Sequence, residues 1–208
     1  TNYNAWETYL KSLQIFNNRN PSDHEDIELK EAQRLCEKSI KLDDSMSHAY
    51  SLLAKICEWE LLQFTTEDSK KTLNEMLSYA KKAEELDSKN PIAAYGIARH
   101  FFFSGKFEQA KFYSERAIQL NPSYPDAQNI LGQSLVHSGK FAESEKHFLK
   151  AIELNPLDPN AILYKDGLYF AQMGLGNYEM AYFLIEECIS QFSKAGFYKG
   201  FRAAVLGY

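Results

Sequence analysis

Two neighbouring stretches of 34 residues carry the same pattern. Residues 91–124 read PIAAYGIARHFFFSGKFEQAKFYSERAIQLNPSY, and residues 125–158 read PDAQNILGQSLVHSGKFAESEKHFLKAIELNPLD. Both contain SGKF at the same offset, and both carry Ala-Ile-x-Leu-Asn-Pro near their ends. A gap-free recurrence of this length predicts a chain built from one structural unit repeated in tandem.

The spacing of apolar residues within the first stretch predicts a pair of helices. Ala94, Ile97 and Phe101 recur at steps of three and four residues, which places them on one face of a helix. Gly105 follows that helix, where a left-handed residue is favoured. Asn121-Pro122 ends the second helix, because proline disfavours the helical conformation of the residue before it. We therefore expect each stretch to form a helix–turn–helix unit.

This pattern resembles the tetratricopeptide repeat, a helix–turn–helix unit of about 34 residues. The resemblance implies an all-α fold, a right-handed α-solenoid of about five antiparallel helix pairs followed by a terminal helix. The outer repeats are degenerate, and two of them are about ten residues longer. Because the apolar pattern continues from Trp59 to Phe64, we expect longer helices there. We interpret residues 1–208 as a single domain with repeats at 3–46, 47–90, 91–124, 125–158 and 162–195 and a terminal helix at 196–208.

Composition and charge restrict the classes of function. The chain has 208 residues, 45% hydrophobic and 25% charged, which is typical of a folded globular protein. Its net charge is −5, and no stretch is dense in Lys and Arg, so we expect no direct nucleic-acid binding. No apolar run is long enough to cross a membrane, so we expect no membrane insertion.

The chain begins at Thr1, and we read it as a piece of a longer protein. A cytoplasmic location is favoured, with the periplasm as the alternative if the parent protein has a membrane span upstream.

No residue pattern in the sequence predicts catalysis. Cys36, Cys57 and Cys188 form no CxxC pair, and each falls on a repeat position that packs between helices. The five histidines have no spacing typical of metal ligands. Phosphate-binding loops and nucleophile motifs are absent from the sequence. We therefore expect a protein that is not an enzyme, with no catalytic residues, no cofactor and no metal.

The first part of the chain has a narrower resemblance. It is similar to the opening of the tetratricopeptide tails of bacterial class III adenylate cyclases and winged-helix transcriptional regulators. The matching pieces are Tyr9-Leu10, Asn18 to Pro21, Ser39 to Asp43 and Ala49 to Ala54. Lys11-Ser12 departs from the usual Arg-Gly, and Asp44 departs from the usual proline.

This resemblance implies a non-catalytic regulatory or sensor arm of a bacterial signalling or transcription-regulating protein. The alternative is a stand-alone adaptor or scaffold in a multiprotein assembly or secretion system.

In the tetratricopeptide repeat family, which this pattern resembles, certain positions of the first helix of each repeat face a concave groove. That groove binds a protein or peptide partner. The residues of this chain at such positions that we select as candidates are Lys55, Tyr95, Arg99, Phe102, Asn129, Gln133, His137 and Phe170. Lys55, Arg99 and Gln133 share one repeat position and are expected to form a polar row that binds the backbone or a carboxylate of an extended peptide. We expect Arg99→Ala and Gln133→Ala to weaken binding with little effect on stability.

Two further expectations concern the partner. Phe102 and Phe170 are either peptide anchors or packing residues against a neighbouring repeat, and self-association is possible. The Lys, Asn and Arg clamp with which chaperone-binding members of the family hold carboxylates is absent from the corresponding positions, such as Leu52, Ile92 and Gly96. We therefore disfavour chaperone tails as ligands.

Overall fold

The computed structural model describes residues 2–19, 27–156, 161–191, 201–205 and 207. Every regular element in this part of the chain is a helix, which confirms the expected all-α fold. The helices are α1 (Tyr3–Asn18), α2 (Ile27–Leu42), α3 (Ser47–Gln63), α4 (Ser69–Leu86), α5 (Pro91–Phe103), α6 (Phe107–Leu120), α7 (Pro125–His137), α8 (Phe141–Leu154), α9 (Ala161–Leu175) and α10 (Tyr178–Gln191).

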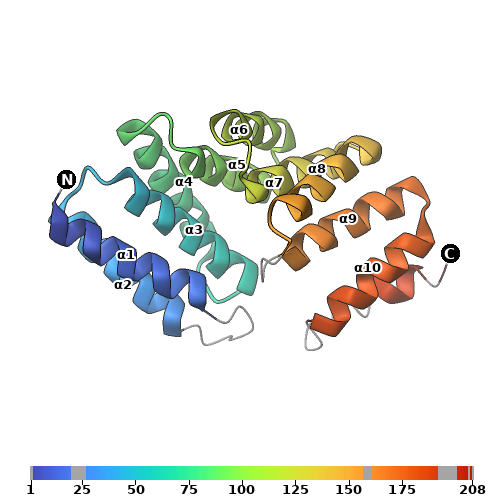
Figure 1. Ribbon diagram of the computed structural model, residues 1–208, viewed down its shortest axis with the longest axis horizontal. Helices are drawn as coiled ribbons and strands as arrows, with labels where there is room; N and C mark the ends of the chain where they lie inside the picture. Colours follow the sequence, from blue (N-terminus) through green and yellow to red (C-terminus); the bar gives the residue numbers. More distant parts are fainter. Residues whose placement is uncertain (1, 20–26, 157–160, 192–200, 206, 208) are drawn as a thin grey trace. The chain divides into compact units, whose positions relative to one another are not determined.

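The chain divides into two compact units, residues 1–104 with α1 to α5 and residues 105–208 with α6 to α10. Consecutive helices pack as antiparallel pairs within each unit, α1 with α2 and α3 with α4 in the first, α7 with α8 and α9 with α10 in the second (Figure 1). Our interpretation of residues 1–208 as a single domain stays a prediction. Of the expected terminal helix, residues 201–205 are helical, whereas 192–200, 206 and 208 lie outside the described residues.

Local sequence signals begin and end the helices. The Asn90 side chain accepts from the backbone N–H groups of Ile92 and Ala93, at 2.9 and 3.4 Å, and so caps the start of α5. Gly105 and Gly139 follow α5 and α7 with φ angles of 69° and 72°, in the left-handed region that favours glycine. These glycines confirm the expected turns inside the two clear repeats.

The longer second repeat has longer helices, as its apolar pattern predicts. The helices α3 and α4 contain 17 and 18 residues, whereas α7 and α8 contain 13 and 14. Phe64 ends α3 in the left-handed conformation, with φ of 56°, and its side chain is 90% exposed. No helix among the described residues combines the length and apolar character needed to span a bilayer.

Small residues bring the helices of the first unit close together. Ala5, Ser12, Ala32 and Ser39 are fully buried between α1 and α2. The Ser12 hydroxyl donates to the Ala32 carbonyl over 2.6 Å, and the Ser39 hydroxyl donates to the Ala5 carbonyl over 2.8 Å. Each serine therefore satisfies its own hydroxyl while leaving room for the opposite backbone.

Phe148 organises the core of the second unit. Its fully buried ring lies against glycines of both neighbouring first helices, Gly132 of α7 and Gly167 of α9. A Cβ atom would lie 2.8 Å from the ring at Gly132 and 2.2 Å from it at Gly167. Both positions therefore exclude a side chain, because packed interiors do not admit such distances.

Candidate functional site

A buried polar cluster, made of Glu58, Tyr95 and Arg99, joins α3 to α5 in the first unit. The Tyr95 hydroxyl lies 2.6 and 2.8 Å from the two carboxylate oxygens of Glu58. Arg99 Nε lies 2.7 Å from Glu58 Oε1, and the Glu58 and Arg99 side chains are only 6% and 5% exposed. The carboxylate therefore has both a compensating cation and a hydroxyl donor, as a buried charge requires.

Cations and aromatic rings alternate beside this cluster. The Arg19 guanidinium lies 3.9 Å from the ring centre of Phe16 and 4.2 Å from that of Trp59. The half-buried Lys55 places its ammonium 6.0 Å from the Phe16 ring and 5.7 Å from the Tyr95 ring. Stabilisation of cations by ring faces is expected at these distances. Lys55 is thus held above two rings while the residue as a whole stays partly exposed.

In the second unit, two contacts hold α7 beside α9. The Tyr164 hydroxyl of α9 donates to Asp126 Oδ1 of α7 over 2.8 Å. About two turns further along α7 and one turn along α9, Gly132 and Gly167 lie against the same Phe148 ring. Both helices therefore advance in the same direction, and the residues between these contacts lie at similar levels along the two helices.

Asn129 and Asp166 lie between these two contacts. Asn129 is 7% exposed and Asp166 is partly buried. No donor among the described residues lies within hydrogen-bond distance of the Oδ1 atom of either side chain. Lys165, the next residue to Asp166, instead pairs with Glu187 of α10 at 3.1 Å. Burial raises the pKa of Asp166 to about 7.

The remaining candidates of the second unit are more accessible. Gln133 is half-buried on α7, and Phe170 is 37% exposed on α9. His137 is exposed and stacks on Phe107 with the ring centres 4.1 Å apart. Partial burial lowers the pKa of His137, which favours the neutral imidazole near pH 7.

The structure assigns different environments to the eight candidate residues. Three of them are buried, namely Tyr95, Arg99 and Asn129, whereas the other five keep some exposure. The structure does not support the expectation that Arg99→Ala leaves stability unchanged, because the substitution would strand the Glu58 carboxylate. Phe102 and Phe170 both have aromatic neighbours, Phe103 at 6.2 Å and Phe201 at 5.2 Å. Whether the eight residues bind a partner stays a prediction.

Sequence reasoning missed Glu58 as a member of this site. The residue lies three positions after Lys55 on α3, on the face that we assigned to the groove. Glu58 is an isolated acidic residue on a face that otherwise carries Lys55 and Arg99. This difference in charge was the sequence signal for an ion pair. Its pairing with Arg99 depends on the packing of α3 against α5, which the local pattern does not specify.

The three cysteines are buried, as expected from their repeat positions. Burial raises the pKa of Cys36, Cys57 and Cys188 to about 12 in each case. Their thiols are therefore protonated at neutral pH, which is unfavourable for a nucleophile or a metal ligand.

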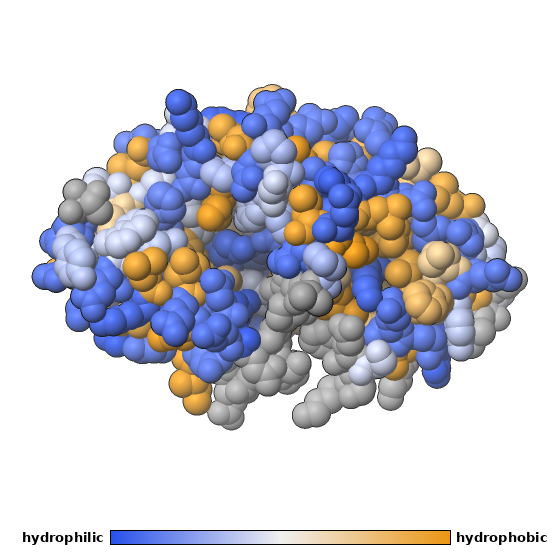
Figure 2. All heavy atoms as spheres, in the orientation of Figure 1, coloured by the Kyte–Doolittle hydropathy of each residue, from blue (hydrophilic) through white to orange (hydrophobic). Residues whose placement is uncertain are grey.

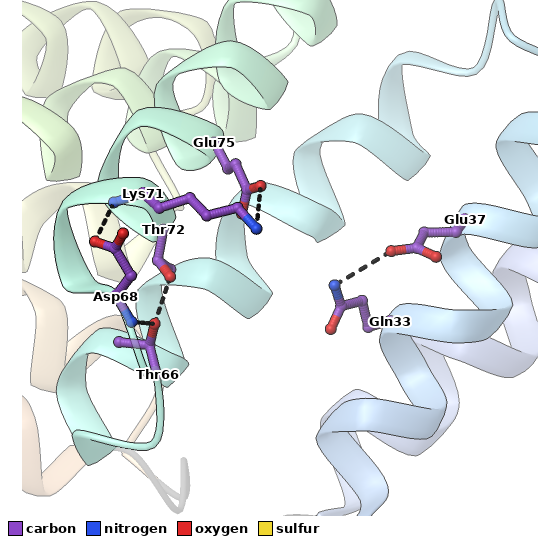
Figure 3. Close-up of polar contacts among 7 residues, drawn as sticks. All are labelled: Gln33, Glu37, Thr66, Asp68, Lys71, Thr72 and Glu75. Atoms are coloured by element: carbon purple, nitrogen blue, oxygen red, sulfur yellow. Dashed lines mark hydrogen bonds and ion pairs between the residues drawn. The ribbon is translucent and has the colours of Figure 1, made fainter.

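A shallow hollow of about 390 Å³ lies over the first turns of α4. Its side chains are engaged locally (Figure 3): Asp68 caps the Lys71 N–H at 3.0 Å, and Lys71 pairs with Glu75 at 3.8 Å. Beside the hollow, the hydroxyls of Thr66 and Thr72 lie 2.6 Å apart. On a different helix, α2, Gln33 donates to Glu37 over 3.2 Å.

Hydrophobic residues on the face in Figure 2 are interspersed with hydrophilic ones. The hollow is therefore a less specific candidate than the faces of α7 and α9.

Comparison with known proteins agrees with the repeat pattern. Residues 93–124 and 125–158 match the tetratricopeptide repeat family. No curated protein matches the sequence as a whole.

Solved structures share the fold at low sequence identity. TTC0263, a thermophilic tetratricopeptide repeat protein of Thermus thermophilus, is 15% identical with a TM-score of 0.67, and the match covers 98% of this chain and all of that one. A chain of the anaphase-promoting complex hetero-tetramer Cut9–Hcn1 is 16% identical with a TM-score of 0.73, covering 97% of this chain and 39% of that chain. YrrB, described as having an unusual peptide-binding site, is 18% identical with a TM-score of 0.51, covering 92% and 96%.

Proposed function

Because residues 93–158 match the tetratricopeptide repeat family, we propose that the chain binds a protein partner through the accessible faces of its first helices. One observation carries the proposal. The helices α7 and α9 bury one face around Phe148 and keep polar and aromatic side chains, Gln133, His137 and Phe170, on the accessible face. The hydrophobic core does not require polar or aromatic side chains on the accessible face of these two helices. Tetratricopeptide repeats are in general scaffolds for protein–protein interaction, and we infer a non-catalytic module.

An extended peptide segment fits these side chains best. In the first unit, the Lys55 ammonium donates hydrogen bonds, and in the second the Gln133 amide both donates and accepts them, as recognition of a peptide backbone requires. Phe170 of α9, in the same unit as Gln133, is 37% exposed and offers an apolar surface. Such a mixture of aromatic anchors and polar groups is typical of protein interfaces.

We further propose that the module is a regulatory or sensor arm of a bacterial signalling or transcription-regulating protein. The similarity of roughly the first 90 residues to the tails of such proteins supports this role. The alternative is a stand-alone adaptor or scaffold in a multiprotein assembly or secretion system. The reading frame around this stretch distinguishes them, since a cyclase or winged-helix domain upstream supports the arm and an initiator methionine supports the adaptor.

The binding proposal is tested by selecting peptides from a phage-displayed random library on the immobilised protein. Gln133→Ala and Phe170→Ala are expected to weaken the selected peptides at least tenfold. Phe112→Ala is the matched control, because that side chain is 61% exposed on α6, away from the proposed face. Equal losses in all three variants, or none in the first two, would contradict the proposal. Sedimentation of the same samples reports self-association.

A further inference from the structure

We propose that Asn129, Asp166 and Phe170 form a site for the cationic head of a Lys or Arg side chain of the bound partner. The inference rests on the proposed function and specifies the chemistry of the ligand. The three residues come from two neighbouring first helices, α7 and α9. We call them the cation site.

The position of Asn129 relative to Asp166 follows from two flanking contacts. On one side, Tyr164 of α9 donates to Asp126 of α7 over 2.8 Å. On the other side, Gly132 of α7 and Gly167 of α9 share the ring of Phe148. Asn129 lies midway between the α7 contacts, and Asp166 lies between the α9 contacts, so the two residues lie at a similar level along the helix pair.

One oxygen of each side chain is buried without a donor among the described residues. The Oδ1 atoms of Asn129 and Asp166 have no hydrogen-bond partner among the described residues. Lys165, the residue before Asp166, pairs instead with Glu187 at 3.1 Å. A buried acceptor without a donor costs about 1–3 kcal/mol, and an ionised one costs more. The missing partner is therefore a donor, and a cation suits the Asp166 carboxylate better than a neutral amide does.

Phe170 completes the cation site. It follows Asp166 by four residues on α9, so both lie on the same face of that helix. Its ring is 37% exposed and held in place by Tyr169 and Phe201, with ring centres 4.9 and 5.2 Å away. A carboxylate, an amide oxygen and an aromatic face together are suited to a guanidinium or ammonium group. Asp166 is itself partly exposed, so a side chain can approach from this face.

The first test uses a single cationic side chain as the probe. N-acetyl-arginine amide is titrated into the ¹⁵N-labelled protein, with the citrulline analogue as an uncharged control of nearly the same shape. We expect the arginine probe to shift the Asn129 side-chain amide and the Phe170 backbone amide, and the citrulline probe to leave them unchanged. Asp166→Asn is expected to abolish the shifts, whereas Glu179→Gln, an exposed carboxylate on α10, is expected to keep them. Equal shifts with both probes, or shifts that survive Asp166→Asn, would overturn the cation site.

The second test separates this inference from the proposed function. Peptides selected by the unmodified protein are expected to carry Lys or Arg at one position, and alanine there should weaken binding at least tenfold. Asp166→Lys should reverse the preference to Glu or Asp at that position. Peptides that bind the face of Gln133 and Phe170 without any basic residue would leave the proposed function standing and overturn the cation site. Selection of no peptide by the unmodified protein would overturn both.

Discussion

Replacing Arg99 with methionine isolates the contribution of the buried ion pair to stability. Methionine keeps most of the apolar stem and removes the guanidinium, so the change leaves Glu58 without its cation. The ion pair has a separation of 2.7 Å, and both side chains are at least nine-tenths buried. Removing one partner from a buried pair costs about 3–5 kcal/mol, because the remaining charge is uncompensated.

The geometry places Arg99→Met near the lower end of that range. The Tyr95 hydroxyl still contacts both Glu58 oxygens, at 2.6 and 2.8 Å, and offsets part of the loss. We therefore expect a loss of about 3 kcal/mol in the free energy of unfolding. Combining Glu58→Gln with Arg99→Met removes both charges, and the double variant should be more stable than Arg99→Met alone by about 2 kcal/mol.

Urea unfolding followed by far-ultraviolet circular dichroism measures these differences. Lys146→Met, an exposed cation on α8, is the control and should change the free energy of unfolding by less than about 0.5 kcal/mol. A loss below about 1 kcal/mol for Arg99→Met would refute the assignment of a buried pair that contributes to stability. A double variant as unstable as the single one would refute the role of the stranded carboxylate.

Two further variants test the second unit. Gly167→Ala should destabilise the protein by about 1–3 kcal/mol, because the new Cβ atom would lie 2.2 Å from Phe148. In thermal unfolding, adding Phe148→Leu to the same chain should restore part of this loss. Full stability of Gly167→Ala would contradict the close contact. The pKa of Asp166, about 7, lies above the ordinary value of 3.8, so folding favours the protonated acid and stability falls as the pH rises from about 4 through 7. At pH 8 the free energy of unfolding is lower by about 4 kcal/mol than at acidic pH. In urea unfolding, Asp166→Asn should remove this pH dependence. An unchanged pH profile in the variant would contradict the burial of the carboxylate.

The helices and their order were predictable from the sequence. Ala94 and Ile97 repeat at helical spacing, Gly105 and Asn121-Pro122 mark the ends, and the same signals recur 34 residues later. These signals act over a few residues, because helix periodicity, caps and left-handed turns are local properties of the backbone. The lengthening of α3 followed in the same way from the apolar run that continues to Phe64.

The state of each candidate side chain was decided only by tertiary structure. Lys55 and Arg99 share one repeat position, yet Lys55 is partly accessible and Arg99 is buried against Glu58. That difference depends on contacts such as the hydrogen bond from Tyr95 to Glu58, which joins residues 37 positions apart. Among the described residues, Asp166 Oδ1 likewise has no donor, and the adjacent Lys165 pairs with Glu187 on another helix. A repeat pattern therefore determines which face a residue occupies, and the packing of neighbouring helices determines whether its charge is compensated or left for a ligand.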